Sequence, residues 1–250
     1  MLKWLRGSQK STTSVNKIAA KLRVDIHSHL IPGIDDGAQT IEESLKLIAK
    51  MQHLGFDKLV MTPHVMVDAY PNTSQAIREG LEKLQDAVQS AEINIQLDAA
   101  AEYYLDEGFL PRLETGDILT IGENYLLFET SYMAAPMHLE ELIYAIGAHG
   151  YTPLMAHPER YRYVKDPERE YARWRELGVV FQIDTTSLGG HYGKDAHAKA
   201  RFLLQKGWID FVGSDTHRMR HLEQLETVLS DHALWINLMQ NNNLKNAELT

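Results

Sequence analysis

The sequence predicts an α/β fold in which strands and helices alternate to form a single parallel barrel. Short apolar runs recur along the chain, segments with helical periodicity separate them, and glycines follow four of these segments. With 250 residues, the chain is long enough for one α/β barrel of ordinary size. We therefore expect a single distorted TIM-like (β/α)7 barrel, with a doubly wound open sheet as the alternative.

Seven apolar runs have the length and composition of buried strands. They cover residues 24–26, 59–61, 93–99, 125–128, 153–155, 179–183 and 209–212. The spacing of apolar residues predicts helices within residues 41–51, 77–88, 139–146, 171–177, 196–204 and 222–238. Gly55, Gly150, Gly178 and Gly207 follow four of these helices, as glycines that end helices commonly do.

The two ends of the chain differ in composition from the predicted barrel. Residues 1–23 hold six of the 25 Lys and Arg residues and no acidic residue. We interpret them as a solvated basic arm, with contact to an anionic membrane surface or an acidic partner as the alternative. Residues 24–240 are expected to form one domain, followed by a polar, frayed tail over residues 241–250.

Composition also excludes several classes of site and partner. The chain has no cysteine, so a disulfide, a thiolate metal site and a cysteine nucleophile are impossible. Beyond the basic arm, 19 basic residues stand against 34 acidic ones, which argues against nucleic acid as the main partner. No apolar run could cross a bilayer and no secretory signal is recognisable, so we expect a cytoplasmic protein without stable membrane insertion. Whether it forms an oligomer stays open.

Ligand-type side chains follow six of the seven predicted strands. They are His27, His29, Asp36, His64, Glu102, Glu129, His157, Asp215 and His217. The carboxyl ends of parallel strands meet at one face, and imidazole and carboxylate groups there suit two or three divalent metal ions. Each residue alone could be a cap or a paired buried charge, but so many unpaired charges would destabilise the fold without metal. We interpret Asp35 as a turn residue, assign no role to Asp184, and place His221 among the packing or surface histidines.

Residues 25–37, which read DIHSHLIPGIDDG, resemble the opening motif of the PHP (polymerase and histidinol phosphatase) superfamily. The resemblance is closest to its metal-dependent protein-tyrosine phosphatases from bacterial capsule and exopolysaccharide operons. Similar later blocks follow in the same order, at Thr62-Pro63-His64, His157-Pro158-Glu159-Arg160, Gly190-His191-Tyr192-Gly193 and Ser214-Asp215-Thr216-His217. The matching segments span residues 24–240 of the chain.

The resemblance implies a trinuclear site, with Mn as the expected metal and Fe or Zn as alternatives. His27, His29, Glu102 and Asp215 would hold one ion, Glu102, Glu129 and His157 a second, and Asp36, His64 and His217 a third. Arg160 matches the family arginine that binds the phosphate. Arg218 and Arg220 both offer a second arginine, and we choose Arg218 as the substrate-binding residue. Catalytic roles are assigned to Arg160, His29 and Asp215.

The function expected from this resemblance is that of a metal-dependent phosphomonoesterase. It would cleave phosphotyrosine by attack of a metal-bound hydroxide, on a tyrosine kinase that regulates capsular or exopolysaccharide synthesis. Activity should fall below about pH 6.5, because ligand imidazoles must be neutral. The apolar residues 132–136 could pack the tyrosine ring or simply cover the barrel edge.

Three other functions remain open at this point. The chain could be a histidinol-phosphate or other small-molecule phosphatase of the same superfamily. It could be a non-catalytic scaffold that metal ions stabilise. A carbon–nitrogen hydrolase of the amidohydrolase type often starts with a similar His-x-His motif, but the later blocks fit it less well.

Overall fold

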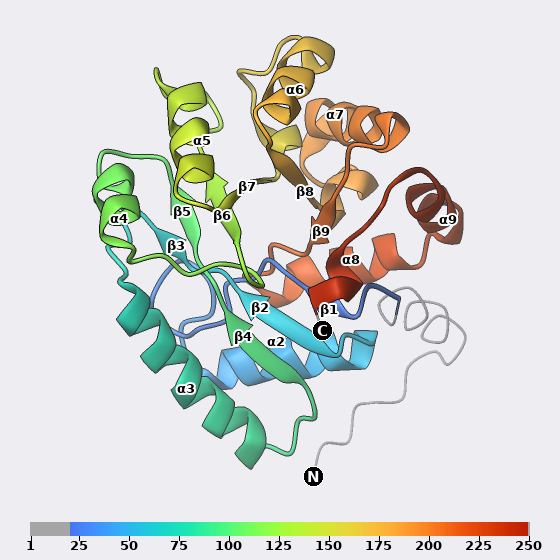
Figure 1. Cartoon of the computed structure of the whole chain (residues 1–250). Helices are drawn as coiled ribbons and strands as arrows, with labels where there is room; N and C mark the ends of the chain where they lie inside the picture. Colours follow the sequence, from blue (N-terminus) through green and yellow to red (C-terminus); the bar gives the residue numbers. More distant parts are fainter. Residues whose placement is uncertain (1–20, 250) are drawn as a thin grey trace.

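The computed structural model describes residues 21–249, and its parallel strands form a curled sheet with helices on the outside (Figure 1). Three strands pair in the order β1 (Val24–Asp25), β2 (Lys58–Met61) and β4 (Gln96–Ala99). Six more pair in the order β3 (His64–Val65), β5 (Glu102–Tyr104), β6 (Tyr125–Glu129), β7 (Thr152–Ala156), β8 (Val180–Asp184) and β9 (Phe211–Gly213). Because β3 closely follows β2 and β5 closely follows β4, the two parts together give seven strand positions.

The first and last strands, β1 and β9, are joined by main-chain hydrogen bonds just beyond their carboxyl ends. The amide of Asp215 donates to the carbonyl of His27, and the amide of His29 donates to the carbonyl of Thr216, each over 2.9 Å. Ser28 and Thr216 form an isolated parallel bridge at the same place. These contacts curl the sheet back on itself, so the prediction of a distorted (β/α)7 barrel is confirmed in preference to an open sheet.

Eight α-helices lie within residues 21–249, not counting the short helical segment at residues 21 and 22. They are α2 (Ile41–Leu54), α3 (Ser74–Ser90), α4 (Phe109–Thr115), α5 (Leu139–Ala148), α6 (Pro167–Glu176), α7 (Gly193–Lys206), α8 (Met219–Leu229) and α9 (His232–Asn241). Short 3-10 helices are η1 (Pro158–Arg160), η2 (Thr185–Gly189) and η3 (Asn246–Leu249).

Two helical features differ from the prediction. The helix expected over residues 222–238 is two helices, since the side chain of Asp231 accepts a hydrogen bond from the amide of Leu234 and starts α9 as its N-cap. The helix α4 was not predicted, because its seven residues are too few to establish a helical period. Gly55 and Gly207 end α2 and α7 in the left-handed conformation, as predicted.

Alternation along the strands separates two apolar clusters. On β6, Leu126 and Phe128 pack in the larger cluster, whereas Leu127 belongs to a smaller cluster with side chains from β1, β2, β7 and β9. Glu129 lies two residues beyond Leu127, and Glu102 lies two residues beyond the buried Ala100 of the same small cluster. Residues two apart share a face of a strand. Glu102 and Glu129 therefore lie on the same face as the small cluster, directly beyond it along the strands.

The prediction of a frayed tail is wrong for the described residues up to Leu249. Asn246 is buried, and its side chain accepts a hydrogen bond from the amide of Val212 over 3.1 Å. It also donates to the carbonyls of Val24 and Val212, at 3.0 and 2.8 Å. The asparagine therefore bridges β1 and β9 where their main chains do not pair directly, a role that a polar composition does not reveal.

At the other end, the basic arm lies almost wholly outside the described residues, which begin at Lys21. Leu22 is buried, and Arg23 forms an ion pair of 2.9 Å with Asp57. The last residues assigned to the arm thus pack on the barrel, while its role and boundary stay predictions. Among residues 21–249, no helix combines the length and apolar character that a membrane span requires.

Replacing Asn246 by Ala should weaken the junction of β1 and β9. The change removes three hydrogen bonds and leaves buried main-chain groups without a partner, each at a cost of about 1–3 kcal/mol. We expect the free energy of unfolding, measured by urea titration with tryptophan fluorescence, to fall by about 3 kcal/mol. Asn243→Ala, at an exposed position of the same segment, is the matched control. Equal stability of the two variants would contradict the bridging role.

Candidate metal centre

All nine predicted ligand residues meet at the carboxyl ends of the strands. Their side chains form four overlapping groups, and the ligand atoms of each group lie within 4.8 Å of one another. The groups are His27, His29 and Asp215; His27, Glu102 and His157; His64, Glu102 and Glu129; and His29, Asp36, His64 and His217. The structure therefore brings these residues together, and their role as ligands stays a prediction.

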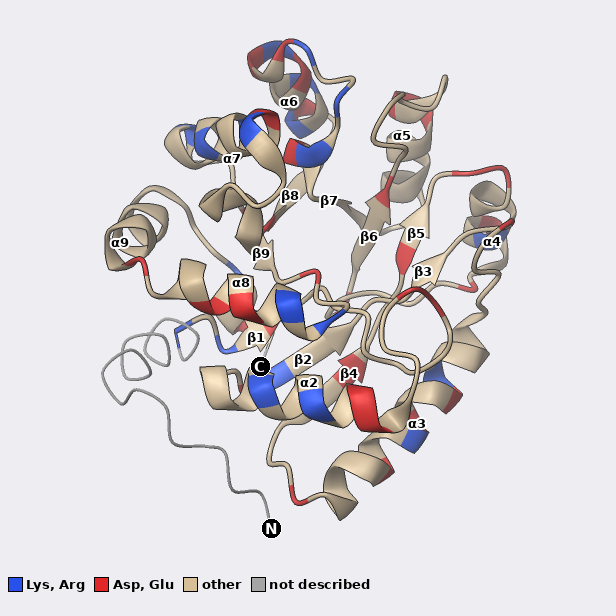
Figure 2. Ribbon diagram, turned by 180° about the vertical axis from the view of Figure 1, so that it is seen from behind, with Lys and Arg blue, Asp and Glu red and all other residues tan. Residues whose placement is uncertain are grey.

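Glu102 lies at the centre of this cluster. Its Oε1 lies 2.9 Å from Nε2 of His157, while its Oε2 lies 3.2 Å from Nε2 of His27 and 3.1 Å from Nδ1 of His64. The carboxylate of Glu102 is completely buried. Figure 2 shows acidic segments on β5 and β6, the strands that carry Glu102 and Glu129. A single carboxylate that faces three imidazoles in this way is suited to bridge neighbouring cations.

Two members of the cluster lie on strained backbone. His157 and Asp215 have φ angles of 33° and 47°, in the left-handed region that side chains other than glycine rarely adopt. Each such residue costs on the order of 1–3 kcal/mol, and strain of this kind persists where surrounding structure fixes it, commonly at functional sites. The turn at His157 leads directly into Pro158 and η1, which carries Arg160.

Two hydrogen-bond acceptors orient the first pair of histidines. Nδ1 of His29 lies 2.7 Å from Asp35, and Nδ1 of His27 lies 2.8 Å from Oε1 of Gln182. Both contacts direct the Nε2 atoms toward the carboxylates of the cluster, as partners of metal-binding histidines do. Asp35 also accepts from the amide of His64 over 3.2 Å, so it is more than the turn residue we predicted.

Other residues close to the cluster were also not recognised from the sequence. His221, assigned to packing, accepts a hydrogen bond from the amide of His217 over 3.2 Å. Gln182 could have been noticed as the polar residue within the apolar strand β8. The sequence gives no sign of the role of Gly213. A Cβ there would lie 2.6 Å from Cβ of His27, so only glycine lets β9 approach β1 this closely.

The charges of the cluster fit divalent cations. Burial alone would lower the pKa of His27, but the facing carboxylates of Glu102 and Asp215 outweigh burial and raise it to about 10. Burial is likewise outweighed at His64, where Glu102 and Glu129 raise the pKa to about 12. Imidazole ligands must be neutral, so a bound metal ion would displace the protons that these carboxylates stabilise on the two imidazoles.

Unsatisfied polar atoms support the same conclusion. Within residues 21–249, the buried atoms without a hydrogen-bond partner include Oε2 of Glu102 and Nδ1 of His64. These two atoms face each other at 3.1 Å, as two ligands of one cation would. Buried polar atoms in a native protein usually have partners, and a metal ion held by these two atoms would account for the exception.

Arg160, the predicted phosphate-binding residue, lies at the edge of the cluster. Its guanidinium forms an ion pair with Asp215, and Nη1 also lies 3.6 Å from Asp184. Arg218 is exposed where α8 begins, and its role in binding substrate stays a prediction. Asp184, to which no role was assigned, is buried and faces Arg160.

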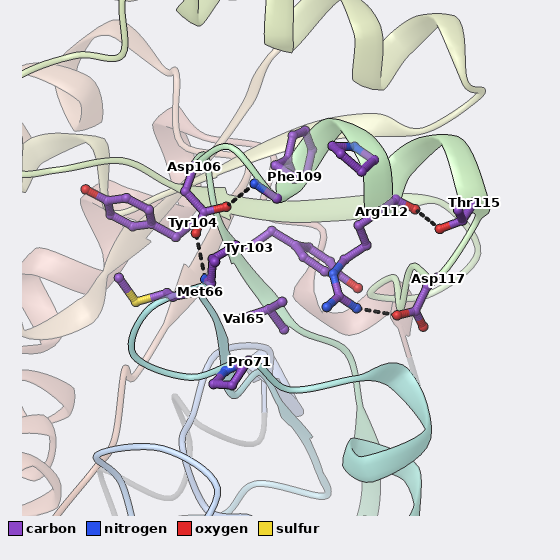
Figure 3. A pocket seen from close by; sticks show the side chains of 13 residues that line it. Val65, Met66, Pro71, Tyr103, Tyr104, Asp106, Phe109, Arg112, Thr115 and Asp117 are labelled. Atoms are coloured by element: carbon purple, nitrogen blue, oxygen red, sulfur yellow. Dashed lines mark hydrogen bonds and ion pairs between the residues drawn. The ribbon is translucent and has the colours of Figure 1, made fainter.

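A pocket of about 370 Å³ lies beside this centre, between the segment after β3 and helix α4 (Figure 3). Its walls are mainly apolar, with Val65, Tyr103 and Phe109 among them. Val65 and Tyr103 adjoin His64 and Glu102 in sequence, so strand alternation directs them away from the metal residues. The nine ligand-type residues are not among the described residues that line this pocket.

The family model for capsular polysaccharide synthesis, CpsB/CapC, matches residues 23–227. The chain belongs to the CpsB/CapC family. The tyrosine-protein phosphatase YwqE of Bacillus subtilis (strain 168) is 29% identical over 198 residues, which cover 79% of this chain and 78% of YwqE. The tyrosine-protein phosphatase CpsB of Streptococcus pneumoniae is 26% identical over 202 residues, covering 78% of this chain and 83% of CpsB.

Solved structures agree with this membership of the CpsB/CapC family. A chain from the crystal structures of YwqE and CpsB, described as unique metal-dependent tyrosine phosphatases, matches with a TM-score of 0.76 at 28% identity. The match covers 87% of this chain and 91% of that chain. A probable 2-pyrone-4,6-dicarboxylic acid hydrolase of Acinetobacter baumannii, with a TM-score of 0.50 at 15% identity, shares the fold alone. The predicted resemblance to the metal-dependent tyrosine phosphatases is confirmed.

Replacing Asp35 by Asn should weaken metal binding although Asp35 is not one of the nine ligand-type residues. The amide is a poorer partner for the Nδ1–H group of His29, so the ring loses orientation and basicity. We expect the affinity for Mn²⁺, measured by competition with a chelating dye, to fall about 10–100-fold. Asp68→Asn, an exposed acidic position nearby in sequence, is the control and should bind Mn²⁺ like the unchanged protein. Unaltered affinity in Asp35→Asn would show that Asp35 does not support the site.

Proposed function

We propose that this chain is a metal-dependent phosphomonoesterase that removes phosphate from tyrosine residues of proteins. One observation carries the proposal: nine ligand-type side chains and Arg160 meet at one face of the barrel. Membership of the CpsB/CapC family supports the same class, because the relatives described above are named tyrosine-protein phosphatases. The number and kind of metal ions are part of the proposal.

We assign the nine ligand-type residues to two or three divalent ions, with Mn first and Fe or Zn as alternatives. His27, His29, Glu102 and Asp215 would hold one ion, Glu102, Glu129 and His157 another, and Asp36, His64 and His217 a third. Bound ions of this kind supply positive charge for the phosphate and lower the pKa of water toward neutrality. The short approach of Glu102 to His27, His64 and His157 supports its place as the shared ligand.

Arg160 contributes the protein's own positive charge. Its planar fork can donate to two phosphate oxygens at once, which a lysine could not do with the same geometry. Asp215 has one oxygen toward the histidines and the other toward Arg160, so it links the phosphate-binding group to the metal cluster. A tyrosine leaving group has a pKa of about 10 and needs little help from an acid, so we assign no general acid.

The segment after β6 is the proposed contact for the substrate tyrosine ring. Tyr132 adjoins Arg160, and Met133, which is 66% exposed, follows it in the chain. An apolar surface beside a phosphate-binding arginine suits an aromatic phosphate ester better than a small polar one. We further propose that the substrate is a cytoplasmic tyrosine kinase that regulates capsular or exopolysaccharide synthesis, in keeping with the description of the family.

The Mn²⁺-loaded protein should hydrolyse a phosphotyrosine peptide with a higher kcat/KM than histidinol phosphate. Arg160→Ala should lower kcat/KM for the peptide by about 10²–10³, the usual effect of removing one transition-state donor. Arg169→Ala, on the exposed side of α6, is the control and should keep full activity. Activity that survives chelation and dialysis would refute the metal-dependent mechanism. Preference for histidinol phosphate would instead make the chain a small-molecule phosphatase, and absence of turnover would favour a scaffold.

A further inference from the structure

Two tyrosines contact Arg160, Tyr132 from the proposed substrate-contact segment and Tyr192, to which the proposed function gives no role. Tyr132 follows β6, Arg160 ends η1 after β7, and Tyr192 immediately precedes α7. The three side chains therefore come from three successive connections between strands and helices, all on the face that carries the metal cluster. Tyr192 belongs to the segment Gly190-His191-Tyr192-Gly193, one of the blocks that resemble the PHP superfamily.

The guanidinium lies over the faces of both aromatic rings. Its central carbon is 4.8 Å from the ring centroid of Tyr132 and 4.2 Å from that of Tyr192. Nη2 donates a hydrogen bond to the hydroxyl of Tyr132 over 2.8 Å. Nη1 is held by Asp215 and lies 3.6 Å from Asp184. Contacts with two rings and anchors at both terminal nitrogens thus restrict the position of one otherwise flexible side chain.

The backbone around Tyr192 is built for this placement. Gly190 and Gly193 have φ angles of 83° and 88°, in the left-handed region that glycine adopts readily. The amide of His191 donates to the carbonyl of Thr186 over 3.2 Å, which ties the segment back to η2. These features explain the Gly-His-aromatic-Gly pattern as a turn that presents Tyr192 to Arg160.

An arginine that must bind phosphate benefits from contacts that restrict its side chain. A free arginine side chain samples many rotamers, and the entropy lost on binding substrate lowers affinity. A ring face attracts the guanidinium through its π electrons, and this contact uses none of the N–H groups. Of the five N–H groups of the guanidinium, the contacts with Asp215, Asp184 and Tyr132 leave donors available for phosphate oxygens.

We propose that Tyr132 and Tyr192 are positioning residues that hold the guanidinium plane of Arg160 toward a phosphate bound at the metal cluster. This inference rests on the proposed function, because it takes Arg160 as the phosphate-binding group. Neither ring is a core residue, since Tyr132 is 36% and Tyr192 is 38% exposed. Their loss should therefore alter the use of Arg160 much more than it alters folding.

A double-mutant cycle between Tyr192 and Arg160 tests the inference. With Mn²⁺-loaded protein and a phosphotyrosine peptide, Tyr192→Leu should lower kcat/KM about 10-fold, the effect expected from a misplaced binding group. Tyr192→Phe keeps the ring and should keep most of the activity. Tyr192→Leu combined with Arg160→Ala should be no worse than Arg160→Ala alone. Tyr144→Leu, at a tyrosine of α5 that is 72% exposed, is the matched control.

Tyr132 offers a second variant that cannot be dismissed as a folding defect. Tyr132→Phe keeps the ring over Arg160 but removes the hydrogen bond to Nη2, and it should lower kcat/KM about 3–10-fold. Its thermal midpoint should match that of the unchanged protein. This loss should also disappear in the Arg160→Ala background, since without the guanidinium the hydroxyl has nothing to orient.

A binding measurement separates failure of this inference from failure of the proposed function. Isothermal titration of inorganic phosphate into the Mn²⁺-loaded protein should show weaker binding in Tyr192→Leu by the same factor as the fall in kcat/KM. If the unchanged protein does not hydrolyse the peptide, the proposed function fails, and phosphate binding alone then decides the role of the tyrosines. Tyr192→Leu that binds phosphate like the unchanged protein, or that weakens binding equally without Arg160, would overturn the inference.

Discussion

The buried carboxylate of Glu102 is the constraint on which the rest of the structure depends. It has no exposed surface, and it faces His27, His64 and His157 within 3.2 Å. Burial by itself would raise the pKa of this carboxyl, but the charges of His27 and His64 hold it well below its ordinary range. A negative charge in such a place is stable only among positive charges. Protons on the imidazoles can provide them, and divalent metal ions would do so while leaving the imidazoles neutral.

The barrel is arranged around this requirement. Glu102 meets His27 after β1, His64 of β3 and His157 after β7 because the sheet is curled, and the closure of β9 on β1 adds Asp215 to the same cluster. Main-chain hydrogen bonds of His27 and His29 join β1 to β9 beyond their carboxyl ends, and the side chain of Asn246 joins the two strands themselves at Val24 and Val212. The left-handed backbone at His157 and Asp215 is a second consequence, because an unstrained strand end would direct those side chains elsewhere. The strained backbone at these two residues thus lowers the stability of the fold at the site of the cluster.

Much of the fold and the convergence of the nine ligand-type residues could be predicted from the sequence for one physical reason. Parallel strands bring their carboxyl ends to one face, so a side chain such as His64 or Asp215 can be placed from its position after an apolar run. What supports those residues could not be predicted in this way. Gln182 and Asn246 act through hydrogen bonds to partners distant in sequence, and Asp35 joins His29 to the amide of His64, 29 residues further along the chain. The sequence does not reveal these partners, even where a residue such as Gln182 differs from its neighbours. The contacts of Arg160 with two tyrosines are equally hard to predict, because the tyrosines come from separate connections.

Counting bound metal ions before and after replacing Glu102 tests the central claim most directly. Protein stripped with a chelator, reloaded with Mn²⁺ and freed of excess ion should hold two or three ions per chain by elemental analysis. Glu102→Gln keeps the size of the side chain but removes the shared charge, so it should hold fewer ions and lose its phosphotyrosine phosphatase activity together with them. An unchanged number of bound ions in Glu102→Gln, or full turnover by protein that holds no metal, would contradict the claim that this carboxylate organises a polynuclear site.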